Sequence, residues 1–219
     1  FGYATYQFTV PASEIAWQLT LPPLEGNPNM AVRKDSVPNE DYSQAFSEQP
    51  AGTADNITLV PDTLKDGTFY LTVYSANDYR FRYALQSSPP AITEIDFSSV
   101  TTNTETDRVG WRFFRLTDLD QQINKLGWNL YLTNEAPGTR IALRSSKAPG
   151  TWLYRDPAAK SANFYDALST GNFLQRPAQQ AAAWYVGVFN TSNALGAFKL
   201  VTGELTPAPI PNGQLVVQT

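Results

Sequence analysis

The chain has 219 residues, of which 42% are hydrophobic and 13% are aromatic, and its formal net charge is −4. It contains neither cysteine nor histidine, so it cannot build a thiolate nucleophile, a histidine-ligated metal site or a Ser-His-Asp triad on its own. The lysines and arginines are scattered along the chain, which argues against the basic patch that a nucleic-acid partner requires.

The first 85 residues predict a series of short β-strands. Residues 4–10 alternate with a period of two, so that Tyr6, Phe8 and Val10 share one face, and Pro11 ends the run. This alternation is typical of an antiparallel strand with one buried face. By the same criterion, we expect further strands at residues 15–21, 29–34, 57–60, 69–74 and 79–85.

Residues 86–91 predict a short and stiff linker, because they contain the consecutive prolines Pro89 and Pro90. Residues 92–100 predict a strand that opens a second domain. The other strands expected in that domain lie at residues 111–117, 127–132, 140–144, 184–190 and 196–203. Residues 150–182 form a longer, aromatic-rich stretch that we expect to be mainly loop.

After Thr206 the chain becomes rich in proline, and residues 214–219 resemble one more strand. The tail 207–219 resembles the opening strand of a further module, whereas nothing before residue 4 corresponds to the strand at 92–100. We therefore expect a fragment of a larger protein, with a first domain at 1–85, a linker at 86–91 and a second domain at 92–206. No stretch is long and apolar enough to predict a membrane-spanning helix.

The second half of the chain repeats the first. An offset of 111 carries residues 30–33 onto 141–144, and Trp17 onto Trp128. The offset is 108 near the start of each half, where Tyr6 falls on Phe114, and 115 near the end, where residues 69–74 fall on 184–189. A repeat of this length is typical of tandem domains rather than of a solenoid. The fold class expected is therefore all-β, with two tandem antiparallel β-sandwiches.

Paired aromatic residues and unpaired ones suggest different roles. Trp17 and Trp128 alternate with other apolar residues, so we expect them in the two cores. Arg33 and Arg144 also correspond, either as ligand contacts or as stems that cover apolar surface. Aromatic residues that lack a counterpart are candidates for ligand binding, because loop aromatics can stack on sugar rings or anchor a protein interface. These candidates are Tyr42, Trp152, Tyr154, Phe164 and Phe173.

Acidic residues leave two further possibilities open. Calcium could bind between turn aspartates, although such residues are also common in turns for backbone reasons. The aspartates in question are Asp62, Asp66, Asp118 and Asp120. Glu40, Asp41 and Glu48 form a loose acidic set, but their positions do not predict the facing carboxylates of a glycosidase. We expect no enzyme activity and no cofactor.

Three segments of the first half resemble the bacterial pre-peptidase C-terminal domain. They are Tyr6-Gln-Phe-Thr-Val-Pro11, the segment from Gly26 to Pro38 and the segment from Gly67 to Ser75. The second half is similar to the same family at residues 140–149 and 183–190. The resemblance implies a jelly-roll-like β-sandwich that accompanies secreted proteases and other exported enzymes without taking part in catalysis.

Together these features predict a non-catalytic accessory module of a larger secreted or cell-surface bacterial protein. Its expected partner is a polysaccharide or an extracellular protein. The alternative is a structural spacer or self-assembly repeat, in which the tail 207–219 of one copy pairs with the first module of another.

Overall fold

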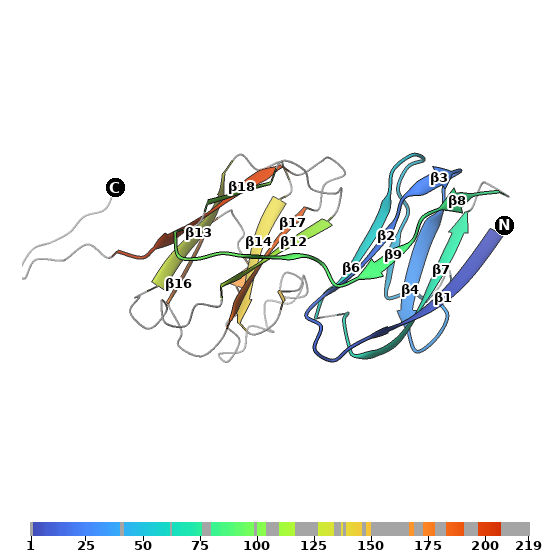
Figure 1. Cartoon of the computed structure of the whole chain (residues 1–219), viewed down its shortest axis with the longest axis horizontal. Coiled ribbons are helices and arrows are strands. Elements are labelled where there is room, and N and C mark those ends of the chain that lie inside the picture. The colour runs from blue at the N-terminus through green and yellow to red at the C-terminus, as the bar shows by residue number, and fades with distance from the viewer. Residues whose placement is uncertain are drawn as a thin grey trace, which may run out of the picture.

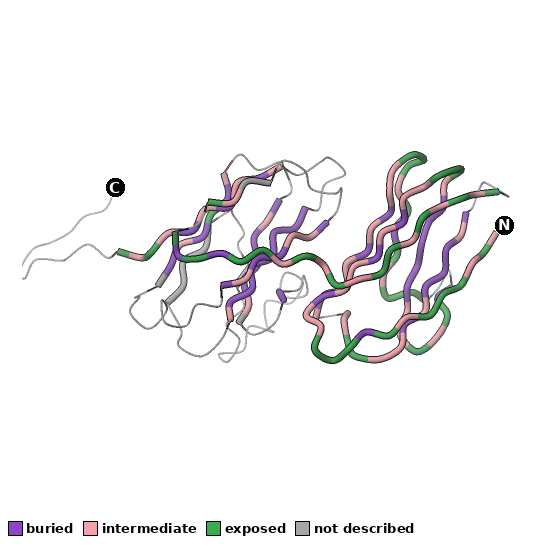
Figure 2. The backbone as a smooth tube through the Cα atoms, in the orientation of Figure 1, coloured by how far each residue is buried: buried purple, intermediate pink, exposed green. Residues whose placement is uncertain are grey.

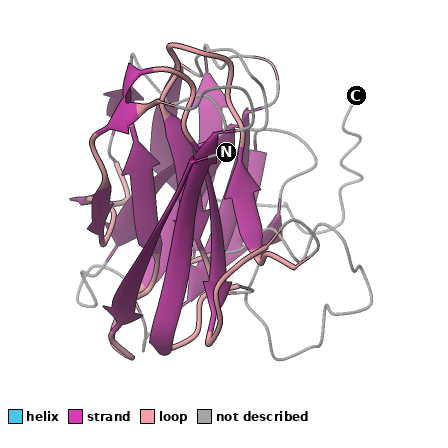
Figure 3. Ribbon diagram, turned by 90° about the vertical axis from the view of Figure 1, so that its right-hand side faces the viewer, coloured by secondary structure: helices cyan, strands magenta, loops and turns pink. Residues whose placement is uncertain are grey.

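A computed structural model describes most of the chain as β-strands and connecting segments. The residues described are 2–39, 42–61, 63–75, 80–98, 100–103, 110–116, 127–133, 137, 139–145, 148–149, 167–168, 173–177, 183–190 and 197–206. No helix occurs among them (Figure 3). In this part of the chain there is accordingly no helix that could cross a membrane.

The first module contains β1 to β9, arranged as two main sheets with a short extension. One sheet has the order β1-β7-β4-β5, with bounds Gly2–Val10, Gly67–Ser75, Asn29–Lys34 and Ala45–Ser47. The second has the order β6-β2-β9, with bounds Asp55–Leu59, Trp17–Leu21 and Gln86–Ser88. The extension pairs β3 (Pro23–Glu25) with β8 (Arg82–Tyr83).

The second module contains β10 to β18 and repeats this plan with extra strands. Its first sheet has the order β10-β12-β17-β14-β15, with bounds Ile92–Glu94, Gly110–Leu116, Trp184–Asn190, Thr139–Ser145 and Ala167–Leu168. Its second sheet has the order β11-β18-β13-β16, with bounds Val100–Asn103, Phe198–Glu204, Gly127–Thr133 and Phe173–Pro177. All described strand pairs are antiparallel except β10 with β12, which is parallel.

The four main sheets follow one another along the long axis of the molecule (Figure 1). The β10-β12-β17-β14-β15 sheet of the second module lies nearest to the first module, and the β1-β7-β4-β5 sheet lies at the far end. Figure 3 looks onto that far end. The fold is thus a pair of β-sandwiches, as the alternating sequence predicts.

Strand register confirms the internal repeat. Phe8 pairs with Phe69 in the first module, and Leu116 pairs with Trp184 at the same place in the second. These are the correspondences that the offsets of 108 and 115 predict. Because both strands keep their offset along the ladder, β1 corresponds to β12, β7 to β17 and β4 to β14.

Each sandwich has its own core between its two sheets. The first core includes the fully buried Leu19, Met30 and Phe69. The second includes the fully buried Trp128 and Trp184. The expectation that Trp128 is a core residue is confirmed, whereas Trp17 is only half-buried and packs against the edge of the first core.

Several boundaries differ from the sequence expectation. The predicted linker 86–91 is wrong in its first part, because residues 86–88 form β9 and pair with β2 through Gln18, Leu19 and Thr20. Main-chain hydrogen bonds do not require apolar side chains, so the polar Gln-Ser-Ser sequence can form an edge strand. The connection that remains consists of residues 89–91.

Three other segments also differ. The strand expected at 92–100 is divided into β10 and β11, with a turn between them in which the Ser98 backbone nitrogen donates to Asp96 Oδ1 at 2.7 Å. The strand expected at 79–85 is reduced to β8 among the described residues. The stretch 150–182 contains β15 and β16, so it is not entirely loop.

Candidate interaction surface

The side chains that point outward from the β1-β7-β4-β5 sheet form an aromatic surface. Tyr3 lies opposite Tyr74, and Ala31 lies between Thr72 on one side and Phe46 on the other. Cross-strand partners share one face of a sheet, and the core residues of these strands occupy the alternate positions. These five residues therefore lie together on the side away from the core, and we name this surface the aromatic face.

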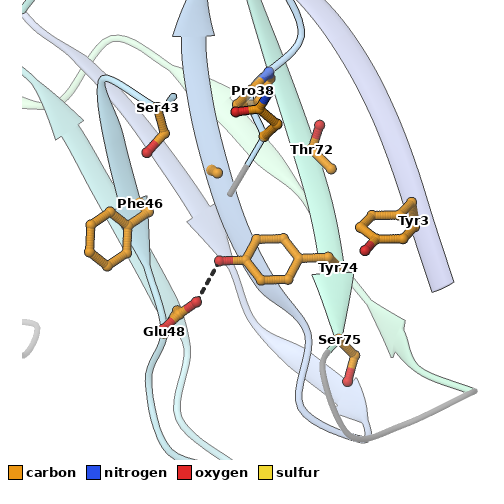
Figure 4. A pocket seen from close by; sticks show the side chains of 10 residues that line it. Tyr3, Pro38, Ser43, Phe46, Glu48, Thr72, Tyr74 and Ser75 are labelled. Atoms are coloured by element: carbon orange, nitrogen blue, oxygen red, sulfur yellow. Dashed lines mark hydrogen bonds between the residues drawn. The ribbon is translucent and has the colours of Figure 1, made fainter. Parts of the chain in front are cut away.

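A cavity of about 430 Å³ lies in the aromatic face. Its floor is formed by the small residues Ala31 and Thr72, which are each 7% exposed, whereas Tyr3 and Phe46 at its sides are 63% and 65% exposed. Figure 4 shows Tyr3, Phe46 and Thr72 around the cavity. The remaining lining residues are Pro38, Asn39, Ser43, Glu48, Tyr74 and Ser75.

Polar groups accompany the aromatic rings. The Tyr74 hydroxyl donates a hydrogen bond of 2.7 Å to Glu48 Oε1 (Figure 4). On the same face of the sheet, Thr72 Oγ1 and Asn29 Oδ1 have no hydrogen-bond partner among the described residues. The face therefore combines exposed rings with hydrogen-bonding capacity that the described protein groups leave unused.

A buried carboxylate holds the segment that carries Glu48. Asp55 Oδ1 accepts hydrogen bonds from Ser47 Oγ at 2.5 Å and from the Gln49 backbone nitrogen at 3.0 Å. Asp55 is fully buried. Burial raises the pKa of its carboxyl group, although the hydrogen bonds from Ser47 and Gln49 act in the opposite direction. Because its two donors flank Glu48 in the chain, Asp55 is a positioning residue for this edge of the aromatic face.

Tyr42, a candidate from the sequence, lies beside the aromatic face. Its side chain is 62% exposed, and the Arg33 guanidinium carbon lies 5.5 Å from its ring centroid, within the range of a cation–π contact. Its backbone nitrogen donates to Asn39 Oδ1 at 2.8 Å, which ties it to a residue of the cavity lining. This ring contact is neither of the two roles considered for Arg33 from the sequence, which were a ligand contact and a stem that covers apolar surface.

In the second module, the corresponding face is covered. Trp111 and Phe189 pair where Tyr3 and Tyr74 pair, and Gly187 takes the position of Thr72. The Trp111 ring lies 4.7 Å from the Phe189 ring and 5.4 Å from the Phe113 ring, measured between centroids. It also lies over Gly187, where an added Cβ would be 2.5 Å from Trp111 Cζ3.

The first module provides part of this cover. Ala16 and Val60, from two loops at the end of the first module, are buried with Phe113 and Ala148 of the second. Ile15, Ile92 and Trp111 pack around this cluster. The same sheet face thus occurs twice in the chain: it packs against a neighbouring module in one copy, whereas in the other, among the described residues, its Tyr3 and Phe46 are exposed.

Of the other ligand candidates from the sequence, Phe173 is the one that the described residues include, and it does not lie at this surface. Phe173 lies in β16, paired with Tyr131 on the sheet of the second module that is farthest from the first module. Trp152, Tyr154 and Phe164 lie outside the described residues. Of the aspartates considered for calcium, Asp66 is described and lies exposed in the turn before β7, while Asp62, Asp118 and Asp120 lie outside the described residues.

Sequence reasoning missed most of the aromatic face. Tyr3, Phe46 and Tyr74 stand in strands, whereas the search for binding residues favoured aromatics in loops. A usable signal was present in β7, where Tyr70 and Tyr74 occupy positions that alternate with the core residues Leu71 and Val73. Such a strand is apolar on both faces, which indicates that both faces are packed or bind something.

Comparisons with known proteins do not identify the chain. No protein-family model and no curated protein matches it. Among solved structures, it is similar to a candidate secreted protein from Eubacterium rectale, with a TM-score of 0.26 and 12% identity over 91% of this chain and 68% of that one. It is also similar to a conserved protein of unknown function from Pseudomonas aeruginosa, with a TM-score of 0.25 and 13% identity over 93% and 80% of the two chains. Likenesses this distant carry no argument, and the resemblance to the pre-peptidase C-terminal domain stays a prediction.

Proposed function

We propose that this chain is a non-catalytic structural unit of a larger secreted or cell-surface bacterial protein, and that its aromatic face binds the end of another β-sandwich module. The observation that carries this proposal is the contact between the two modules. In this contact, the corresponding sheet face of the second module binds the end of the first module, so the chain already uses this face once for packing between modules.

The contact between the modules also indicates what kind of group the aromatic face would accept. On the second module, the cover consists of small apolar side chains from loop ends, Ala16 and Val60, set beside large rings. On the first module, Ala31 and Thr72 leave a hollow between Tyr3 and Phe46. A small apolar loop residue from another module would fit this hollow and would bury both rings.

The energetics favour such a contact. Burying a large apolar side chain contributes about 1.5–3 kcal/mol, and Tyr3, Phe46 and Tyr42 are all more than half exposed. Clusters of exposed apolar residues on a soluble protein mark interaction surfaces. Among the residues that line the cavity, Glu48 is the charged one. Burial of the face would therefore remove few ionised groups from solvent.

The proposal is tested by sedimentation velocity over a range of protein concentrations. We expect the full chain to associate as its concentration rises, and we expect Phe46→Ser to weaken this association at least tenfold. Leu24→Ser is the matched control, because Leu24 is 63% exposed but belongs to β3, away from the aromatic face. A full chain that stays monomeric, or equal effects of both substitutions, would contradict the proposal.

A second candidate function is polysaccharide binding at the same cavity. It is supported by the exposed rings next to Asn39, Ser43 and Glu48, because sugars combine apolar ring faces with hydroxyl groups. Affinity electrophoresis with a panel of neutral and acidic polysaccharides tests this function. Retardation that Tyr3→Ala abolishes would favour it, whereas unchanged mobility throughout the panel would rule it out.

A further inference from the structure

A second cavity, of about 320 Å³, lies where the two modules meet, and we name it the junction cavity. Its lining includes Gln18 of β2 from the first module, residues of β10, β11 and β12 from the second, and Pro90 and Ala91 from the connection between them. This connection is exposed or half-buried along residues 89–91 (Figure 2). Ligand sites often occupy such junctions between domains, and the volume of the cavity lies within their usual range of about 300–1,000 Å³.

The first module presents Gln18 to the junction cavity because of the alternation in β2. Leu19 and Leu21 are fully buried in the first core, so the Gln18 side chain between them lies on the opposite face of the sheet. Ala16, two residues earlier, is fully buried in the cluster that joins the modules. The junction cavity therefore continues the contact between the modules, and Gln18 supplies both a donor and an acceptor there.

The second module presents an aromatic ring that its neighbours hold in place. Trp111 is half-buried, and its ring lies 5.4 Å from the Phe113 ring and 4.7 Å from the Phe189 ring, measured between centroids. Phe113 is itself buried in the cluster that joins the modules. A fixed indole ring that lines a cavity offers a flat surface on which the apolar face of a sugar can stack.

Hydroxyl groups from two further strands complete the lining. Thr93 of β10 is exposed and lies opposite Phe114, and Thr101 of β11 is half-buried. Each threonine hydroxyl can donate one hydrogen bond and accept others. Together with the Gln18 amide, these hydroxyls supply the kind of hydrogen-bonding groups that the hydroxyls of a sugar require.

The charge of the lining favours an anionic ligand. Arg112 is the charged residue among the described residues that line the junction cavity. A guanidinium group matches a carboxylate in geometry and can bind it through two parallel hydrogen bonds. Arg112 also makes a further interaction, and its five N–H donors allow it to bind more than one group. The aromatic face differs in this respect, because the charged residue in its cavity is Glu48.

We propose that the junction cavity binds a uronic acid residue of an acidic polysaccharide. The sugar ring stacks on Trp111, and its carboxylate binds Arg112. Gln18 and the two threonine hydroxyls bind the hydroxyl groups of the sugar. The proposal is independent of the aromatic face, whether that face binds a module or a polysaccharide.

A ligand in the junction cavity contacts both modules. Gln18 belongs to the first module, whereas Trp111 and Arg112 belong to the second. These groups surround one cavity only while the modules are packed together. A ligand that binds one arrangement stabilises it by mass action, so the uronic acid residue strengthens the packing between the modules.

The experiment is isothermal titration of the full chain with three probes. Tetragalacturonate carries sugar rings and carboxylates, cellotetraose carries rings without carboxylates, and a tetra-aspartate peptide carries carboxylates without rings. We expect saturable binding of tetragalacturonate and at least tenfold weaker binding of the other two. Failure of tetragalacturonate to bind overturns the proposal, as does equal binding of either other probe.

Substitutions on the two modules localise the binding. We expect Gln18→Ala and Arg112→Gln each to weaken the binding of tetragalacturonate at least tenfold, and Tyr3→Ala, which alters the aromatic face, to leave it unchanged. Gln18→Ala is decisive even if Arg112→Gln impairs folding, because the Gln18 side chain points away from the first core. Unchanged binding by Gln18→Ala, or loss of binding by Tyr3→Ala, would place the sugar elsewhere and overturn the proposal.

Discussion

Single side chains decide whether a module can pack against this sheet face. Gly187 shows this most directly, because the Trp111 ring and Pro149 occupy the space above it. At the corresponding place in the first module, Thr72 and Ala31 are small enough to leave a cavity. In each module, the residue at the centre of the sheet thus sets how closely the groups above it can approach.

Gly187→Ala is expected to destabilise the protein. A Cβ at this position would lie 2.5 Å from Trp111 Cζ3 and 2.8 Å from Pro149 Cγ, so the cover must shift, at a cost of about 1–3 kcal/mol. Gly203→Ala in β18 is the matched control, because a Cβ added there would meet nothing within 4 Å among the described residues. Thermal or urea unfolding of the two variants measures the difference, and equal stability would refute the close approach of Trp111.

Asp55 is expected to make stability depend on pH. Burial raises its pKa in the folded state above 3.8, so the folded state holds this proton more tightly than the unfolded chain does. Its contribution to the free energy of unfolding is therefore fully present below pH 3.8 and is lost as pH rises through the folded-state pKa.

The variant Asp55→Asn keeps an oxygen that can accept from Ser47 and Gln49 but removes the titration. Urea unfolding from acidic to neutral pH should show the wild-type chain losing stability relative to this variant as pH rises. A difference in stability that is constant over the whole range would show that the carboxyl group is not perturbed.

At this scale the sequence predicted the core better than the surface. Trp128 follows from its place in an alternating, repeated strand. Tyr3 and Tyr74 could not be assigned in the same way, because an exposed ring and a buried ring look alike in a β-strand. What separates them is whether a neighbouring module covers the sheet, and that depends on packing between distant residues.

At the scale of elements, β10 and β11 with the described residues between them close one side of the second sandwich. The strand β10 extends one sheet and β11 the other, and Ile95 and Phe97 between them are buried in the core. Because Ile95 and Phe97 belong to the same core cluster as Phe114 and Leu116, their removal would expose part of this core.

Phe97→Ala tests this role of the segment. Removing a buried phenylalanine side chain costs about 3–5 kcal/mol, and Phe97 is 3% exposed and in contact with Trp128. Phe46→Ala is the control, because Phe46 is 65% exposed and a surface substitution usually changes stability by less than about 0.5 kcal/mol. Similar unfolding free energies for the two variants would be inconsistent with Phe97 as a core residue.

Long, alternating strands were predicted from the sequence and short ones were not. The strand β17 lies at the expected residues 184–190, since seven consecutive positions fit one buried sheet. Two strands, β5 (Ala45–Ser47) and β9 (Gln86–Ser88), are too short to show a period. They form by pairing with β4 and β2. These errors do not affect the repeat offsets, because the offsets depend on core residues.

At the scale of the whole molecule, the two modules pack against each other through a small apolar cluster. Ala16 is fully buried in the cluster that joins them, so Ala16→Arg would place a charge in an apolar contact. We expect the modules to separate, with a larger radius of gyration in small-angle scattering and cleavage by proteases near residues 89–91. Ala12→Arg, at an exposed position in the same loop region, should change neither quantity, and an unchanged radius for Ala16→Arg would contradict a packed interface.

The central claim is that the aromatic face of the first module is a binding surface for a second copy. Hydrogen–deuterium exchange of the full chain at low and high protein concentration tests it most directly. We expect new protection at high concentration in β1 and β5, and none in β3 and β8. Exchange in β1 and β5 that does not change with concentration would contradict the claim.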